Sequence, residues 1–258
     1  QVLSKNKQVI EFVQSIRSLP IFVIDKSSKG HEIPDCNVGK ARNRGVAEAS
    51  KRFYESGKNG ILIQTDADTY FEDPDYLKKI LETMQSAPDV IGIAGGLIYE
   101  FDPDTDHLEE RAELEKKIER FVMIKRYEVM TRFINKGEIY SPFQNNTFSG
   151  ANMISKSFES AVIGGLIDAS SGEDPRFGRD LDEYGKYNNT RVIGMKDNLK
   201  VVTALRDSDR TPSSYKKLFD SIDLTKPSEV KGIIVTAELI QDLEIGRASC
   251  RERVSSPV

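Results

Sequence analysis

Residues 60–69 read GILIQTDADT, and this stretch decides the expected fold. Three consecutive aliphatic residues, Ile61 to Ile63, predict a short strand buried inside a sheet. Asp66 and Asp68 follow at the carboxyl end of that strand. Ligands bind at this edge of open α/β sheets, so we expect a functional site at the acidic turn.

Hydrophobic periodicity on both sides of this stretch predicts alternating helices and strands. Continuous apolar runs over 21–24 and 90–94 are typical of buried strands, and the second is expected to end at Gly95 and Gly96. Residues 140–160 are rich in Gly, Asn and Ser and then weakly helical. The alternating order predicts an α/β fold with a mostly parallel central sheet. The other expected elements are helices over 5–18, 40–54, 75–85, 106–135 and 177–184, and late strands over 191–194 and 200–203.

The composition narrows the class of protein. The chain has 258 residues, of which 38% are hydrophobic and 30% charged, as in an ordinary globular protein. Its net charge of −4 lacks the overall basic character of a nucleic-acid-binding protein. No stretch reaches the roughly 20 apolar residues that cross a bilayer. With 2 histidines the chain cannot build a histidine-rich zinc site, so any metal ion would be a hard ion held by carboxylates.

The length favours one domain, which we expect over residues 1–245. Residues 246–258 are rich in Arg and Ser, lack a hydrophobic period and resemble adapter read-through, so we expect a non-native tail there. Cys36 is then the only native cysteine, which favours a reducing compartment and a cytoplasmic location.

The acidic turn has the chemistry of a metal site. Asp66 and Asp68 can point toward one cation, and water and phosphate oxygens would complete the shell of Mn²⁺ or Mg²⁺. Such an ion stabilises a diphosphate as a leaving group. The alternatives are a solvated acidic turn and a phosphatase of the haloacid dehalogenase type, which also places two aspartates after a strand.

A basic turn precedes the strand by one helix. Residues 37–45 read NVGKARNRG, and the turn at Gly39 opens a helix whose free backbone N–H groups are expected to face an anion. Lys40, Arg42 and Arg44 add positive charge there. The alternative is ordinary surface charge.

A second acidic pair follows about a hundred residues later. Glu173 and Asp174 lie where a loop meets a new helix, and a carboxylate in that place can act as a general base toward a hydroxyl nucleophile. The alternative is a helix cap, a position that suits Asp well.

Together these motifs resemble the family-2 glycosyltransferases with the GT-A fold. The resemblance spans residues 20–212 and rests on the order and spacing of five pieces, which are 39–45, 65–69, 149–152, 164–165 with 172–174, and 205–210. It implies a three-layer α/β sandwich, a nucleotide-diphosphate-sugar donor, a divalent metal ion and, mostly, inversion at the anomeric carbon.

The resemblance also implies roles for individual residues. Asp174 would be the catalytic base with Glu173 beside it, Asp68 would bind the metal, and Asp66 would contact the ribose or the metal shell. Groups near the donor would be Lys40 and Arg42 at the nucleotide, Gly95 and Gly96 at the sugar, and Arg206 or Arg210 closing over the diphosphate.

The start of the chain departs from the family pattern. The usual first strand is absent, because a helix leads directly into residues 21–24, and we therefore expect an N-terminal truncation. Asp25 either replaces the nucleotide-contacting aspartate that ends an early strand or ends a later strand.

The expected activity is metal-dependent transfer of a sugar to an acceptor hydroxyl by single displacement. The acceptor would be a glycan, a lipid-linked molecule or a small molecule, which leaves room for peripheral membrane contact but involves no nucleic acid. The alternatives are the phosphatase, with a phospho-aspartate at Asp66, and a non-catalytic nucleotide-sugar-binding domain.

Overall fold

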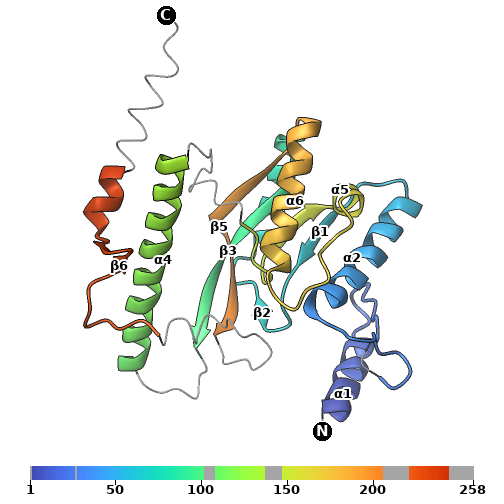
Figure 1. Ribbon diagram of the computed structural model, residues 1–258. Helices are drawn as coiled ribbons and strands as arrows, with labels where there is room; N and C mark the ends of the chain where they lie inside the picture. The colour runs from blue at the N-terminus through green and yellow to red at the C-terminus, as the bar shows by residue number, and fades with distance from the viewer. Residues whose placement is uncertain (1, 27, 102–107, 137–146, 206–220, 244–258) are drawn as a thin grey trace, which may run out of the picture. The chain divides into compact units, whose positions relative to one another are not determined.

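The computed structural model describes residues 2–26, 28–101, 108–136, 147–205 and 221–243 (Figure 1). The chain divides into two compact units. Unit 1 comprises Gln1–Ile98 and Asn146–Val202, and unit 2 comprises Tyr99–Asn145 and Thr203–Val258. Two long strands described below contribute residues to both units. The expected single domain over 1–245 stays a prediction.

Unit 1 contains both helices and strands, interspersed along the chain. Its helices are α1 (Val2–Ser15), α2 (Val38–Glu55), α3 (Tyr76–Ser86), α5 (Ser157–Val162) and α6 (Glu173–Asn188). Its strands are β1 (Ile61–Gln64), β2 (Thr69–Tyr70), β4 (Met153–Lys156) and most of β3 (Val90–Phe101) and β5 (Arg191–Leu205). The α/β class is therefore confirmed.

The central sheet is mixed, because it contains at least one antiparallel strand. Its strand order is β1-β4-β3-β5-β2, and β4 runs antiparallel to both of its neighbours. Ile63 pairs with Ile154 on one side, and Ile154 pairs with Ile93 on the other. The sequence did not predict β4, because four residues containing Ser and Lys lie in a stretch that otherwise reads as loop and helix.

Side chains alternate across the sheet and build two separate cores. Leu62 and Met153 pack on one face against α2 and α6, together with Phe177 and Leu181. The neighbouring residues Ile61, Ile63 and Ile154 belong to a second cluster, which is completed by Tyr76, Ile80 and Met84 of α3. Helices thus cover both faces, and unit 1 has three layers.

The expected strand over 21–24 is wrong. These residues form no regular structure and are exposed, from 38% at Val23 to 64% at Phe22. Within the part of the chain that the structure describes, the sheet ends at β1 and β2, and neither strand pairs with this run. An apolar run supplies β-propensity, but a strand needs a neighbouring backbone. The Phe22 ring instead lies 3.9 Å below the Arg52 guanidinium of α2.

Three glycines lie inside a strand or a helix, although the sequence suggested that the element ends there. Each allows a neighbouring part of the chain to approach closely. Gly95 and Gly96 lie inside β3 rather than ending it, and a Cβ on Gly96 would lie 2.0 Å from the Lys196 carbonyl oxygen. Gly185 likewise lies within α6, which begins at Glu173. The two late strands are one, β5.

Unit 2 contains the long helix α4 (Leu108–Lys136), as expected, the hairpin of β6 (Glu229–Val230) and β7 (Ile233–Ile234), and a helical segment over 237–243. Tyr127 of α4 packs with Val235 and Ile240 in its core. Among the described residues, no helix is both long and apolar enough to span a membrane. Arg206, Arg210 and the tail over 246–258 lie outside the described residues.

Candidate active site

The start of α2 lies tightly against the loop that precedes α6. Gly39 makes this possible, because a Cβ there would lie 1.9 Å from the Ile167 carbonyl oxygen. The Gly39 N–H donates to the Ala169 carbonyl at 3.1 Å, and the Lys40 N–H donates to the side-chain oxygen of the N-cap residue Asn37 at 2.9 Å. The N–H groups of Gly39 and Lys40 are therefore already bonded, and for these two the expected free donors to an anion are wrong.

Lys40 is also tied to that loop. Its Nζ lies 3.3 Å from the Asp168 carboxylate and donates to the Asp35 carbonyl at 3.2 Å. The Asn37 amide also donates to Asp168, and this hydrogen bond, followed by the contact with Lys40, lowers the pKa of the carboxyl group. Lys40 thus keeps its place beside the site by charge pairing.

Asn43 holds the loop from the next turn of α2. Its side-chain oxygen accepts from the Leu166 N–H at 2.6 Å, and its amide donates to the Leu166 carbonyl. Gly165 makes room for this side chain, since its φ is +73° and a Cβ would lie 2.3 Å from the Asn43 oxygen. Sequence reasoning had not assigned this role to Asn43, although the residue lies inside the basic motif.

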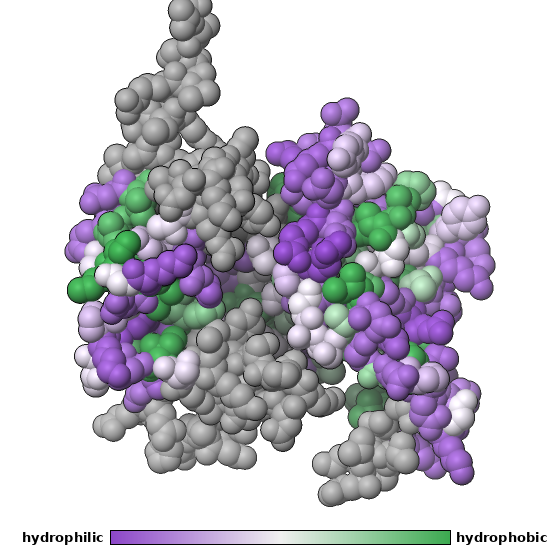
Figure 2. Space-filling view, viewed as in Figure 1, coloured by the Kyte–Doolittle hydropathy of each residue, from purple (hydrophilic) through white to green (hydrophobic). Residues whose placement is uncertain are grey.

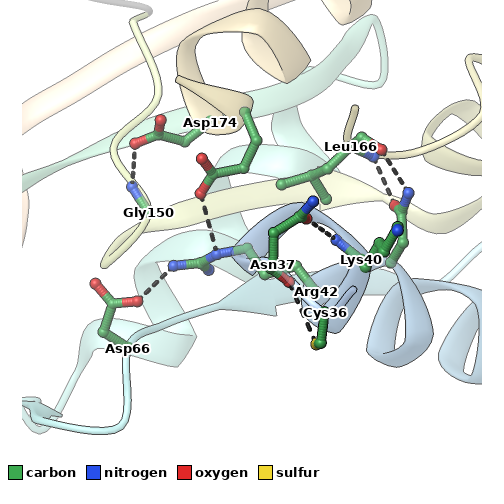
Figure 3. A network of polar contacts seen from close by, with 10 residues as sticks. Cys36, Asn37, Lys40, Arg42, Asp66, Gly150, Leu166 and Asp174 are labelled. Atoms are coloured by element: carbon green, nitrogen blue, oxygen red, sulfur yellow. Dashed lines mark hydrogen bonds and ion pairs between the residues drawn. The ribbon is translucent and has the colours of Figure 1, made fainter. Parts of the chain in front are cut away.

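Arg42 points inward and joins three segments of the chain (Figure 3). Its guanidinium forms an ion pair with Asp66, directly after β1, and its Nε lies 3.6 Å from the Glu173 carboxylate of α6. The Arg42 side chain is 12% exposed and that of Glu173 7%. Arg42 Nε has no hydrogen-bond partner among the described residues, so its interaction with Glu173 is one of charge.

Asp174 lies beside this pair in the first turn of α6, after the N-cap Gly172 at φ +76°. Its Oδ2 accepts the Gly150 N–H at 2.7 Å. Burial first, and then the negative charge of Glu173, raise the pKa of Asp174 to about 6, against the opposing effects of Gly150 and Arg42. The carboxyl group therefore titrates near neutral pH, which suits proton transfer.

Hydrogen bonds of Asn152 fix the position of the turn at Gly150. The Asn152 N–H donates to the Ser149 carbonyl at 2.8 Å, and its buried amide donates to the carbonyls of Gly96 and Leu199, both at 2.9 Å. The Tyr76 hydroxyl donates to the Asn152 oxygen, and burial raises the pKa of Tyr76 to about 12. The sequence had drawn attention to 149–152 only as part of a family pattern.

The remaining expected site residues lie elsewhere in the described chain. Asp68 is half-buried in the turn between β1 and β2. Asp25 lies in the irregular segment before α2 and accepts the Ser28 N–H at 3.0 Å. Gly95 and Gly96 are buried inside β3. Their functional roles stay predictions.

The donor set at the acidic turn fits a hard cation only in part. Asp66 and Asp68 supply carboxylate oxygens, the ligands that Mg²⁺ and Mn²⁺ prefer. No group of three or more metal-ligating side chains occurs among the residues that the structure describes. An ion at this turn would therefore need oxygens from its ligand, as a bound diphosphate provides.

Comparisons with known proteins give one likeness to report. No protein-family model matches the sequence, and no curated protein matches it. The structure is similar to the mannosyltransferase PcManGT from Pyrobaculum calidifontis in complex with GDP-Man and Mn²⁺, with 13% identity and a TM-score of 0.48. The likeness covers 80% of this chain and 46% of the mannosyltransferase chain, so this chain spans about half of its length. At this identity and score it assigns neither an activity nor a ligand.

Proposed function

We propose that the protein is a metal-dependent glycosyltransferase of the GT-A type, which moves a sugar from a nucleotide diphosphate to an acceptor hydroxyl with inversion. The observation that carries the proposal is the environment of Asp174. A half-buried carboxyl group with a pKa near 6 lies next to Glu173, whose ion pair with Arg42 leads on to Asp66 of the acidic turn.

Asp174 acts as the general base in this proposal. It takes the proton of the acceptor hydroxyl while that oxygen forms a bond to the anomeric carbon and the bond to the diphosphate oxygen breaks. Glu173 has a different role, because its buried carboxylate faces Arg42. It holds the arginine and, through its charge, raises the pKa of Asp174.

The departing diphosphate needs positive charge. A Mn²⁺ or Mg²⁺ ion held by Asp66 and Asp68 would supply it when bound. The backbone N–H groups of Gly39 and Lys40 are already hydrogen-bonded within the protein. The fixed positive charge that α2 offers therefore comes from the side chains of Lys40 and Arg42.

One observation disfavours the phosphatase alternative. Asp66 would have to be free to attack phosphorus as a nucleophile, whereas it is ion-paired with Arg42. The binding-domain alternative is decided by experiment.

The Asp174→Asn variant tests the proposal. We expect transfer to fall by about 10²–10⁴-fold, the usual contribution of a general base, with donor binding retained. Asp182→Asn, on the same helix but paired with Lys186 at 3.5 Å, is the matched control and should keep its activity. Transfer that survives in Asp174→Asn would show that the base is misassigned.

Donor binding is measured by thermal shift with UDP-, GDP- and dTDP-sugars, each with and without Mn²⁺. We expect one nucleotide to stabilise the protein only when the metal is present, because a ligand that binds the native state raises its melting temperature. No stabilisation by any donor in the presence of Mn²⁺ would contradict the proposal. Binding without turnover in the unsubstituted protein would favour the binding domain.

A further inference from the structure

A groove runs along the side of α2 that faces α5, and Asp66, Arg42 and Glu173 are not among its lining residues. It lies between α2, α5 and the loop at Ile33 and Pro34, and its volume is about 920 Å³. This size is at the upper end of the clefts that hold small molecules in proteins. The α2 residues that line it include a stripe on one helix face, because they recur every three or four positions: Lys40, Arg44, Ala47, Lys51 and Tyr54.

The groove is positively charged in an acidic protein. Lys40, Arg44, Lys51 and Lys58 line it, and none of its lining residues is acidic, although the chain carries a net charge of −4. Lys40 and Lys51 pair with carboxylates at 3.3 and 3.8 Å. Within the described ranges Arg44 and Lys58 have no acidic partner, so their charges are available to a ligand.

The opposite wall is apolar and exposed. Phe158 and Val162 of α5 are 56% and 52% exposed, and Tyr54 across the groove is 84% exposed. Figure 2 shows hydrophobic side chains over α5 next to hydrophilic ones over α2. Exposed apolar side chains gathered in a depression and bordered by charge mark a binding surface.

Most neutral polar side chains of the groove are already used. The hydroxyls of Ser50, Ser157 and Ser160 donate to neighbouring groups of the protein, and both side-chain atoms of Asn43 are bonded to Leu166. The groups left to a ligand are then mainly the cations and the apolar side chains. A hydrocarbon chain needs no hydrogen-bond donor, and an anionic head group needs only the cations.

We propose that this groove binds a lipid phosphate, with the hydrocarbon chain on Phe158, Val162 and Tyr54 and the phosphate on Arg44 or Lys58. The groove is elongated, as the ligand requires. Arg44 and Tyr54 are ten residues apart on α2, which is about 15 Å at 1.5 Å per residue. The inference does not depend on glycosyl transfer, since the side chains proposed to hold the lipid are not those assigned to transfer and binding is measured directly.

The test is calorimetric titration of the whole chain with dihexanoyl phosphatidic acid below its micelle concentration. Dihexanoyl phosphatidylcholine and inorganic phosphate are titrated in parallel. We expect saturable binding of phosphatidic acid, at least tenfold weaker binding of phosphatidylcholine, and no saturation by inorganic phosphate. Equal affinities for the two lipids, or saturation by phosphate alone, would overturn the proposal.

Variants locate the site. Arg44→Gln with Lys58→Gln should weaken phosphatidic acid binding at least tenfold, and so should Phe158→Ser, which removes the apolar wall. Lys78→Gln with Lys200→Gln removes two exposed lysines outside the groove and is the matched control. An equal loss in the control pair would contradict a specific site. A dimer that dissociates in Phe158→Ser and binds no lipid would mean that a second copy of the chain occupies the face.

Discussion

At the scale of single residues, the site depends on two adjacent carboxylates of which one pairs with an arginine and the other does not. Glu173 is buried against Arg42, while Asp174 turns to the Gly150 N–H. Burial, and then the charge of Glu173, make Asp174 easier to protonate. Adjacent residues of one motif therefore have different chemistry because their surroundings differ.

The pKa of Asp174 predicts a pH dependence of activity. Because a base must be unprotonated, kcat/KM should rise with pH and level off above an inflection near 6. The inflection should be absent from the residual activity of Asp174→Asn. A profile that is flat between pH 5 and 8 would exclude Asp174 as the base.

Stability should change with pH in the opposite direction. The native protein holds the Asp174 proton to a higher pH than the unfolded chain, so the free energy of unfolding should fall as the pH rises from about 4 to about 6. Above that range Asp174→Asn should be more stable than the unsubstituted protein, by up to about 3 kcal/mol at about 1.4 kcal/mol per pKa unit. Urea unfolding at pH 4 and pH 7.5 measures the difference, and equal differences at both values would contradict the assignment.

Arg42 is the residue whose loss should cost most. Arg42→Gln leaves the buried Glu173 carboxylate without its counter-ion, and breaking a buried pair in this way costs about 3–5 kcal/mol. It should also raise the pKa of Asp174 further. Arg52→Gln, which removes a half-exposed arginine from the same helix, is the control and should cost under about 1 kcal/mol. Urea unfolding measures the free energy of unfolding of both variants. Similar losses of stability in the two would argue against the buried Arg42–Glu173 pair.

At the scale of elements, the two glycines of α2 differ in their role. Gly39 is required for close packing, whereas Gly45 only weakens the helix. A Cβ on Gly39 would lie 1.9 Å from a backbone oxygen of the loop, whereas a Cβ on Gly45 meets nothing within 4 Å. Gly39→Ala should therefore displace the helix start and reduce both stability and activity. Gly45→Ala should stabilise the protein by about 0.5–1 kcal/mol, the helix preference of Ala over Gly. Thermal unfolding of the two variants measures this contrast, and a melting temperature that rises for Gly39→Ala or falls for Gly45→Ala would refute it.

Helices with a long hydrophobic period were predicted well, and so was the short apolar strand β1, but β2 and β4 were not. The helices α2, α3 and α4 follow from apolar residues that repeat over 11 or more positions. β4 has four residues and owes its place to pairing with β1 and β3, which local sequence does not encode. The run at 21–24 has the stronger strand sequence but lacks a neighbouring strand among the described residues.

At the scale of the whole molecule, donor binding should be visible along the chain by hydrogen exchange. With donor and Mn²⁺ we expect slower exchange at the start of α2, the acidic turn, the Gly150 turn and the first turn of α6. The peptide that carries Arg206 and Arg210 should also slow if these arginines close over the diphosphate. Unchanged exchange in that peptide would exclude this role, and the core around Tyr127 and Ile240 serves as the internal reference.

The sequence by itself determined the α/β class, most helices and the three motifs that carry charge, because periodicity and residue type are local properties. Only the tertiary structure decided how those charges pair. Arg42 meets Asp66 and Glu173, which are 24 and 131 positions away in the chain. It also decided that the N–H groups at the start of α2 are used internally and that β4 reverses the sheet direction. Each depends on segments that folding alone brings together, and the pKa of Asp174 depends on the burial that results.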